Sequence, residues 1–341
     1  MYCVSNINNA PALVKPSFKE PDVPPHIHVE AQRPCTEDEL MQFTRTIVND
    51  LLARTGIRVD AALPPQHAEV DARVRATVAG WDIGNVSRAR LERYMVTGIM
   101  MSTMTFGHTA LETQVMIALN TTCVTCIDDD ELDVGALAEF AARLQAGQPQ
   151  LHPLLDRYAE LLRRMPECFC PYSATAILAD SINFVNSTLF EGELESMRLR
   201  PAAGKYPTYK RARNGLGDVY AAFIWDKFSF PDVSTFIQAF PDTITVTFFI
   251  NEVLSFYKEE LSGDTKNFVH DCARIASRDT HSFVRELLDG IVAAVDAARG
   301  ILDGEKEREA WERWLTGFVS WHILTPRYRI ASLVENGAEG C

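Results

Sequence analysis

Side chains that could ligate a metal are concentrated at two places, and the first is the stretch TCIDDDELDVG at residues 125–135. It places five acidic residues within the six positions 128–133, directly after a long apolar run. Carboxylates near the C-terminal end of a helix face the negative end of its dipole, and Asp129 and Asp133 form a like-charge pair four residues apart. Because the cluster opposes the local electrostatics, we expect it to bind a cation rather than to be a simple solvated face.

Dense carboxylate oxygens suit the hard cations Mg²⁺ and Ca²⁺ better than zinc. A calcium-binding loop would use Asp128, Asp130 and Glu139 as ligands. In such a loop, however, Leu132 would occupy a ligand position and Asp133 would replace the required glycine. The pattern therefore favours Mg²⁺, which typically binds one or two protein carboxylates and completes its shell with water and substrate phosphates.

The second group lies in NEVLSFYKE at residues 251–259, where Asn251, Ser255 and Glu259 recur every four residues. On a helix this spacing aligns an amide oxygen, a hydroxyl and a carboxylate along one stripe. Taken alone, the triplet would be interpreted as ordinary polar residues beside a packed face, but Lys258 adds a point charge suited to a phosphate. Together the two groups predict a clamp around one Mg²⁺–diphosphate cluster.

Helices are the elements expected to position both groups. Apolar residues recur at three- and four-residue intervals, most clearly in residues 39–55, 88–106, 108–126, 155–165, 243–261 and 281–302. The best strand pattern, TITVTFF at 243–249, continues into a helical pattern without a turn. We therefore expect one all-α domain over residues 38–335, between a proline-rich, irregular or disordered arm at 1–37 and a short tail at 336–341.

The composition narrows the functional class. A formal net charge of −13 argues against a nucleic-acid partner, because phosphate backbones are bound by clustered Lys and Arg. No apolar run approaches the length of a membrane span and the N-terminus lacks the apolar segment of a secretory signal, so we expect a cytoplasmic protein without a membrane span. Cys123 and Cys126 form one CxxC with no second pair at zinc-like spacing, which predicts reduced, buried thiols.

In combination, these motifs resemble those of class I terpene cyclases, and more narrowly those of the fungal trichodiene synthase-like sesquiterpene synthases. DDELD at 129–133 matches the aspartate-rich DDxxD pattern, and residues 251–259 match the N-x-x-x-S-x-x-x-E metal motif. The resemblance extends over residues 80–333 and is supported by LQAGQPQLHP (144–153), FEG (190–192), RARNGLG (211–217) and FVSWHILTPRYR (318–329). It implies a single-domain class I terpenoid synthase bundle, all helical, around a central active-site cavity.

The resemblance also assigns roles to individual residues. It implies that the Mg²⁺ ligands, in a family that uses three ions, are Asp129, Asp130, Asp133, Asn251, Ser255 and Glu259. Asp129 would be the main ligand of the aspartate-rich motif, whereas the role of Asp128 stays open.

Other residues would bind the diphosphate and assist its departure. The resemblance implies that Arg211 senses the diphosphate, that Asn214 links it to the next residue, and that the main-chain carbonyl of Gly215 faces the substrate. It further implies that the diphosphate is contacted by Lys258, Arg327 and Tyr328, with Arg90 as the best match for an upstream arginine.

The chain departs from the family pattern near its C-terminal end. The basic motif of the family reads like DRRY, whereas this chain has Thr325, Pro326, Arg327 and Tyr328. Because proline lacks an N–H and disrupts a helix, Pro326 predicts a kink that puts the geometry around Arg327 in question. This departure and the additional Asp128 leave the product unassigned.

Aromatic residues could stabilise a carbocation by ~0.5–2 kcal/mol each. Phe318, Trp321, Thr325 and Tyr328 fall on one helical face. An aromatic stripe at this spacing is equally typical of a plain core, but the family positions that align with Phe318 and Trp321 line the cavity. Further candidates are Phe184 and Phe190, and we interpret His322 as a structural histidine rather than a base.

The expected activity is that of a terpene synthase, a carbon–oxygen lyase acting on diphosphates. The enzyme would ionise farnesyl diphosphate with the help of Mg²⁺, release diphosphate, and cyclise the carbocation to a sesquiterpene hydrocarbon or alcohol. Two alternatives stay open. One is a chain-elongating isoprenyl diphosphate synthase, which normally carries a second aspartate-rich motif, and the other is a non-enzymatic, acidic helical protein that binds divalent ions. The resemblance is also compatible with a homodimer and with C10 or C20 substrates.

Overall fold

The computed structural model describes residues 36–84, 86–129, 132–194 and 197–334, and this part of the chain is helical without any strand. The α-helices are α1 Glu37–Thr55, α2 His67–Ala79, α3 Arg88–Phe106, α4 Leu111–Asp129, α5 Val134–Ala146, α6 Pro153–Arg164, α7 Pro171–Glu193, α8 Tyr206–Asn214, α9 Gly217–Ala222, α10 Phe240–Ser262, α11 Phe268–Ala276, α12 Thr280–Ile301 and α13 Glu305–Leu324. Short 3₁₀ helices are η1 Met165–Glu167, η2 Val233–Thr235, η3 Ile237–Ala239 and η4 Ala331–Leu333. The all-α prediction is confirmed.

Contacts group residues 35–341 into one compact unit, separate from residues 1–34. The expected arm at 1–37, apart from its last two residues, lies outside the described residues, and so does the expected tail at 336–341.

Local sequence explains where individual helices begin. At the start of α1 the main-chain N–H of Glu39 donates to the hydroxyl of Thr36 (3.3 Å), and the N–H of Thr36 donates to the Glu39 carboxylate (2.9 Å), which is a capping box. The strand-like run TITVTFF lies inside α10. Its threonines accept the helical conformation because Thr243 and Thr247 donate their hydroxyls to carbonyls four residues earlier.

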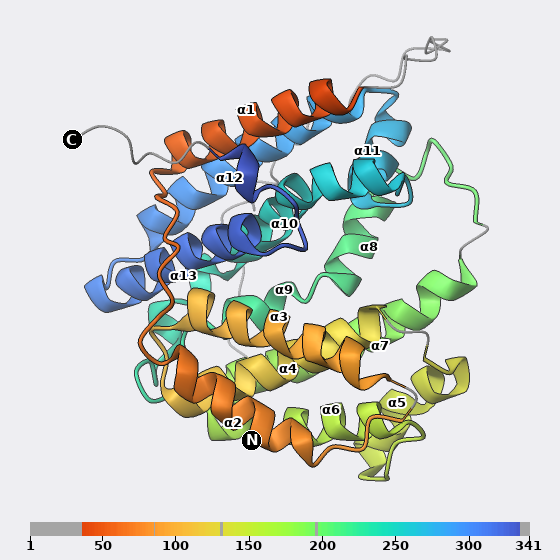
Figure 1. The fold of residues 1–341 in the computed structure, drawn as a ribbon, viewed down its shortest axis with the longest axis vertical. Coiled ribbons are helices and arrows are strands. Elements are labelled where there is room, and N and C mark those ends of the chain that lie inside the picture. Colours follow the sequence, from red (N-terminus) through yellow and green to blue (C-terminus); the bar gives the residue numbers. More distant parts are fainter. Residues whose placement is uncertain (1–35, 85, 130–131, 195–196, 335–341) are drawn as a thin grey trace, which may run out of the picture. The chain divides into compact units, whose positions relative to one another are not determined.

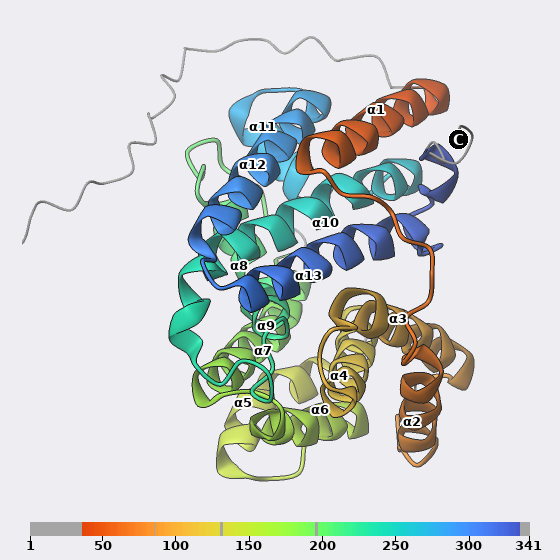
Figure 2. The same cartoon turned by 90° about the vertical axis from the view of Figure 1, so that its left-hand side faces the viewer.

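The helices pack in two groups on either side of α10 and α13 (Figures 1 and 2). Helices α1 and α12 lie on one side, where α12 packs against α10 and α1 contacts both. Helices α3, α4 and α7 lie on the other side, with α13 packed along α3 and with α9 between α7 and α10. This arrangement places the C-terminal end of α4, the middle of α10 and the end of α13 in one region of the unit.

Two glycines permit close contact between these helices. A Cβ atom added to Gly98 of α3 would lie 2.5 Å from the main-chain oxygen of Ala118 in α4. One added to Gly317 of α13 would lie 2.0 Å from the main-chain oxygen of Met104 in α3. A larger side chain at Gly98 would push α3 away from α4, and one at Gly317 would push α13 away from α3.

The two cysteines of the CxxC stretch lie inside the fold. Cys123 and Cys126 are buried in α4, and burial raises the pKa of the Cys123 thiol well above its usual value. Their burial agrees with the prediction of buried thiols.

In the described ranges, no helix combines the length and apolarity that crossing a membrane requires.

Candidate active site

The acidic cluster lies where α4 ends, as the sequence predicts. Asp129 is the last residue of α4, and Asp133 is the N-cap of α5, where its carboxylate accepts a hydrogen bond from the N–H of Ala136 (3.0 Å). Asp130 lies outside the described residues. The structure thus gives Asp133 a capping role, which stabilises the first turn of α5, in addition to the predicted metal-binding role.

Asp128 lies at the same end of α4, and its side chain is exposed. Desolvation by the surrounding protein, followed by the charge of Asp129, raises its pKa, because both effects disfavour the ionised carboxylate. A cation bound nearby would relieve this cost.

Two of the predicted arginines converge on Asp129. Arg327 forms a bidentate ion pair with its carboxylate, with nitrogen–oxygen distances of 2.9 and 3.2 Å. Arg90 donates to the main-chain oxygen of Asp129 (2.8 Å). The pair with Asp129 raises the pKa of Arg327, so this guanidinium stays charged beside the acidic motif.

The departure at Thr325 and Pro326 does not displace Arg327 from the site. Helix α13 ends at Leu324, Thr325 is its extended C-cap, and Pro326 follows outside the helix. The predicted kink within a helix is therefore absent from α13, because the chain leaves the helical conformation before the proline, as residues preceding proline favour. A turn in which the N–H of Tyr328 donates to the oxygen of Thr325 (3.1 Å) follows, and it brings Arg327 to Asp129.

The second oxygen stripe lies on α10 as predicted. Asn251 accepts a hydrogen bond from Arg211 (2.9 Å) through its Oδ1. Glu259 accepts one from the side-chain amide of Asn267 (3.1 Å) and lies 3.6 Å from the ammonium of Lys258. The hydroxyl of Ser255, on the same stripe, is buried without a hydrogen-bond partner among the described residues.

Arg211 connects α8 to this stripe. Its Nε lies 2.7 Å from a carboxylate oxygen of Glu252, whose side chain is 7% exposed, and its guanidinium carbon lies 5.0 Å from the centre of the Phe248 ring. Burial raises the pKa of Glu252 to about 6 even though Arg211 opposes the shift. Glu252 therefore holds the predicted diphosphate sensor in place in this structure, a role that the sequence analysis missed.

The predicted linker and its neighbour lie where α8 breaks into α9. Asn214 donates from its side-chain amide to Glu191 of α7 (2.7 Å). A Cβ atom added to Gly215 would lie 2.3 Å from the Phe248 ring, so a larger residue there would require this ring to move. Leu216 follows with a φ of 52°, in the left-handed region that is unfavourable for a residue with a side chain. The surrounding contacts therefore impose this break.

Asp180 of α7 stabilises the far side of the break. Its buried carboxylate accepts the main-chain N–H groups of Asp218 (3.0 Å) and Val219 (3.3 Å) in the first turn of α9. Burial, and then the charge of Asp218, raises the pKa of Asp180 to about 7. A carboxylate at a helix start satisfies otherwise unpaired N–H groups.

Successive contacts join the two predicted metal-binding groups. Arg327 pairs with Asp129, and the adjacent ring of Tyr328 lies 5.6 Å from the ammonium of Lys258 on α10. Lys258 in turn lies beside Glu259. The structure thus brings together the end of α4, the segment after α13 and the stripe on α10, although they are far apart in the sequence.

A comparison with protein-family models identifies the family to which the chain belongs. The family model described as Trichodiene synthase (TRI5) matches residues 74–339, which is most of the chain. The chain belongs to this family. A terpene synthase is therefore the correct enzyme class, and the two alternatives, a chain-elongating synthase and a non-enzymatic ion-binding protein, are not supported.

Individual relatives agree with this family. The chain is 32% identical over 296 residues to monoterpene synthase 25 of Postia placenta, an alignment that covers 85% of this chain and 88% of the relative. It is 30% identical over 268 residues to alpha-cuprenene synthase of Coprinopsis cinerea, covering 77% and 81%. Among solved structures, a linalool/nerolidol synthase from Streptomyces clavuligerus superimposes with a TM-score of 0.60 at 16% identity, covering 78% of this chain and 99% of that one, which shows the shared fold.

Three of the aromatic residues predicted for the cavity of this terpene synthase lie in or just after the last turns of α13. Phe318 and Trp321 are stacked with ring centres 6.5 Å apart, and Trp321 meets the Tyr328 ring edge to face at 5.4 Å. All three are buried. Phe184 is also buried, whereas Phe190 is 37% exposed, so the latter does not lie in a closed cavity in this structure.

His322 lies between these rings and α10. It is fully buried, its Nδ1 lies 2.8 Å from the main-chain oxygen of Phe318, and its Nε2 lies 3.3 Å from the side-chain nitrogen of Asn251. Burial lowers the pKa of His322 to about 3. A ring with so low a pKa accepts protons only weakly, which agrees with a structural histidine rather than a base.

The residues present fit a bound divalent cation. Within the described ranges, no group of three His, Cys, Asp or Glu side chains converges as a metal site. However, Asp130 lies outside those ranges, and the predicted ligands Asn251 and Ser255 are not among these four residue types. The hydroxyl of Ser255, one of the predicted ligands, is a buried polar atom without a hydrogen-bond partner in the described part. Since buried polar groups are normally paired, this hydroxyl is available to a polar ligand.

Sequence reasoning missed Glu252, Glu191 and Asp180 as parts of the site. Glu252 directly follows Asn251 in the second motif. An acidic residue at this position was the available signal for a partner of Arg211. Glu191 falls within the FEG stretch, which was quoted for the resemblance without a role. Asp180 offered no pattern at all, because its function depends on a helix start 38 residues later.

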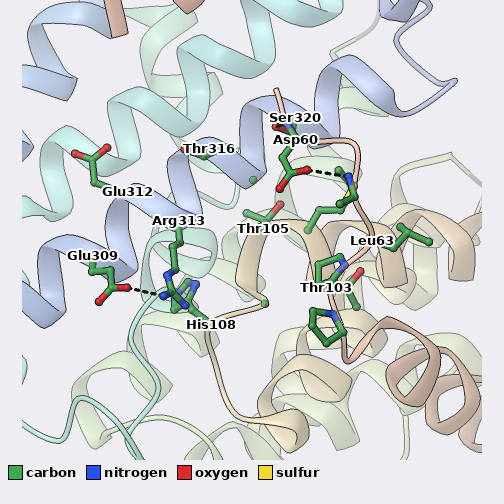
Figure 3. A pocket seen from close by; sticks show the side chains of 16 residues that line it. Asp60, Leu63, Thr103, Thr105, His108, Glu309, Glu312, Arg313, Thr316 and Ser320 are labelled. Carbon is green, nitrogen blue, oxygen red and sulfur yellow. Dashed lines mark hydrogen bonds and ion pairs between the residues drawn. The ribbon is translucent and has the colours of Figure 1, made fainter. Parts of the chain in front are cut away.

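A separate pocket of about 530 Å³ lies at the other end of the α3–α4 pair (Figure 3). It is lined by the end of α3 and by α13, and Asp60, Thr103, His108, Arg313 and Ser320 are among its residues. None of the predicted site residues lines it. The pocket is therefore distinct from the candidate active site.

Proposed function

We propose that this terpene synthase is a Mg²⁺-dependent sesquiterpene cyclase that acts on farnesyl diphosphate. The observation that carries the proposal is the pairing of two predicted diphosphate-binding arginines with two predicted metal ligands. Arg327 binds the carboxylate of Asp129, and Arg211 binds the amide oxygen of Asn251. Cationic and oxygen ligands thus converge from four segments, as an Mg²⁺–diphosphate cluster requires.

Each group would exchange its partner when substrate binds. Bound Mg²⁺ would supply positive charge against the negative charge that develops on the diphosphate as the allylic carbon–oxygen bond breaks. The predicted ligands for the three expected ions are Asp129, Asp130, Asp133, Asn251, Ser255 and Glu259. Because these ligands would no longer need cationic side chains, Arg211 and Arg327 would turn their N–H groups to the diphosphate oxygens.

Lys258 and Tyr328 would complete the diphosphate site. The ammonium of Lys258 lies 3.6 Å from Glu259 and close to the Tyr328 ring, so the pair can reach the same ligand. Fixed donors in a closed, low-dielectric site stabilise a departing anion strongly, since they need no reorganisation during the reaction. Such donors therefore act on the ionisation step itself.

The carbocation would then be enclosed by apolar and aromatic groups. Phe318 and Trp321 on α13 would supply ring faces that stabilise positive charge. The break at Gly215 would place a main-chain carbonyl toward the substrate, with Asn214 linking it to Arg211. Exclusion of water until cyclisation is complete would decide whether the product is a hydrocarbon or an alcohol. A homodimer and a cytoplasmic location remain predictions.

Product analysis tests the proposal. Purified protein is incubated with Mg²⁺ and with C10, C15 or C20 isoprenyl diphosphate, and the extract is analysed by gas chromatography and mass spectrometry. We expect a cyclic C15 product that requires Mg²⁺ and is lost in Asp129→Ala and Asn251→Ala. Turnover of only the C10 substrate, as the name of the Postia relative suggests for that protein, would overturn the substrate assignment. Full activity of both variants would overturn the metal assignment.

A further inference from the structure

His322 and Asn251 form a hydrogen-bonded chain whose polarity is fixed at both ends. At one end the main-chain oxygen of Phe318, 2.8 Å from Nδ1 of His322, can only accept, so Nδ1 carries the hydrogen. At the other end the guanidinium of Arg211, 2.9 Å from an atom of the Asn251 amide, can only donate, so that atom is the oxygen.

The middle of the chain follows from these ends. With Oδ1 of Asn251 toward Arg211, the NH₂ group faces Nε2 of His322 at 3.3 Å. Nε2 is then the bare nitrogen of the ring and accepts this hydrogen bond, which is the tautomer already required by the carbonyl of Phe318. Two independent groups therefore impose the same orientation on the amide.

From this chain we propose that His322 is a positioning residue that presents the amide oxygen of Asn251 to the metal. The inference rests on the proposed Mg²⁺ site. An asparagine amide has nearly the same shape when its oxygen and nitrogen exchange places, but an NH₂ group cannot ligate a cation. In the structure both Arg211 and His322 prevent the exchange. Once Arg211 turns to the diphosphate, His322 alone maintains the orientation.

The position of His322 suits this role. The ring is fully buried and held from three sides, by the Phe318 and Trp321 rings at 4.4 and 4.7 Å and by the Tyr328 ring at 4.6 Å. A side chain packed in this way cannot turn away from Asn251. Groups that orient a metal ligand typically change metal affinity or activity by about 10–100-fold when they are removed.

The first test needs no metal. Protein labelled with ¹⁵N-histidine is studied by NMR without Mg²⁺, and the His322 resonances are identified by their loss in His322→Phe. We expect the tautomer with hydrogen on Nδ1 and a bare Nε2 that is coupled to a hydrogen-bond donor. Asn251→Asp, which lacks the donor, should change the Nε2 resonance. A His322 ring with its hydrogen on Nε2 in the wild-type protein would overturn the proposal.

The second test measures metal-dependent binding of inorganic diphosphate by calorimetry at increasing Mg²⁺. We expect His322→Phe to raise the half-saturating Mg²⁺ concentration about 10–100-fold. The matched control is His108→Phe, because His108 also bonds a main-chain oxygen, that of Ile224 at 2.9 Å, but lies at the other pocket. An equal effect of both substitutions, or a wild-type Mg²⁺ requirement in His322→Phe, would show that His322 only packs.

A double-mutant cycle isolates the orienting effect. A carboxylate at position 251 offers an oxygen in either orientation, so it needs no orienting partner. His322→Phe should therefore shift the Mg²⁺ requirement much less in an Asn251→Asp background than in the wild type. Equal shifts in both backgrounds would overturn the proposal. If the wild-type protein neither binds Mg²⁺–diphosphate nor converts any isoprenyl diphosphate, the proposed function itself fails. If the wild type does both and His322→Phe has the same Mg²⁺ requirement, only the positioning role of His322 is refuted.

Discussion

The substitution Ser255→Ala should weaken function while leaving the fold as stable as before or more so. The hydroxyl of Ser255 is buried in α10 and has no hydrogen-bond partner in the described part of the chain. A buried polar group without a partner costs about 1–3 kcal/mol of folding free energy. Alanine removes that cost and leaves a void of only one oxygen atom, so the free energy of unfolding should stay the same or rise.

Ser102→Ala is a matched control for this effect. Ser102 is equally buried in a helix, but its hydroxyl donates to the main-chain oxygen of Gln114 at 2.6 Å. Its loss should lower the free energy of unfolding by about 1 kcal/mol, which for a unit of this size corresponds to a fall in melting temperature of about 1–2 °C. Differential scanning fluorimetry in the presence of a chelator compares the two variants without metal.

Activity should respond in the opposite order. If Ser255 ligates Mg²⁺, initial rates with farnesyl diphosphate at increasing Mg²⁺ should show a half-saturating concentration at least about tenfold higher in Ser255→Ala, by analogy with the loss of groups that support metal ligands. Ser102→Ala should keep the wild-type value. A variant Ser255→Ala that loses stability as Ser102→Ala does, and keeps the wild-type Mg²⁺ requirement, would refute the reasoning and make Ser255 a packing residue.

Three further predictions concern other parts of the site. Arg327→Ala should lower kcat by about 10²-fold or more, because a donor to the departing diphosphate is lost. The melting temperature should change little, since the ion pair of Arg327 with Asp129 is about one-third exposed. A large loss of stability with a normal kcat would contradict this prediction. Gly215→Ala places a Cβ atom 2.3 Å from the Phe248 ring and should lower the free energy of unfolding, measured in urea, by about 1–3 kcal/mol. The double variant Gly215→Ala/Phe248→Leu should recover part of this loss. A wild-type unfolding midpoint in the single variant would show that the ring moves freely. Burial raises the pKa of Asp180 from 3.8 to about 7, so the native state binds the proton more tightly than the unfolded state, and the free energy of unfolding falls as the pH rises between those values. Between pH 5 and pH 8, Asp180→Asn should lose less of its free energy of unfolding in urea than the wild type does. An equal loss would indicate that Asp180 titrates normally.

The two oxygen-rich motifs could be located from sequence because each depends on local spacing. The aspartate cluster follows a largely apolar run, which predicted the end of α4. The i, i+4, i+8 spacing placed Asn251, Ser255 and Glu259 on one face of α10. The effect of Pro326 was harder to judge. Proline was expected to disturb Arg327, but the helix ends two residues before it, at Leu324, so the disruption falls in a turn.

The amino-acid sequence by itself determined the helices, the candidate ligands and the resemblance to terpene cyclases, because propensity, periodicity and motif spacing act over a few residues. Only the tertiary structure decided which charges face one another. Arg327 meets Asp129 across 198 positions, and Arg211 meets Asn251 across 40. The same holds for the contacts of His322 and Asp180, whose partners lie 71 and 38 positions away. Such pairings depend on how α4, α7, α8, α10 and α13 pack, and packing is set by the shapes of many side chains together rather than by any local pattern.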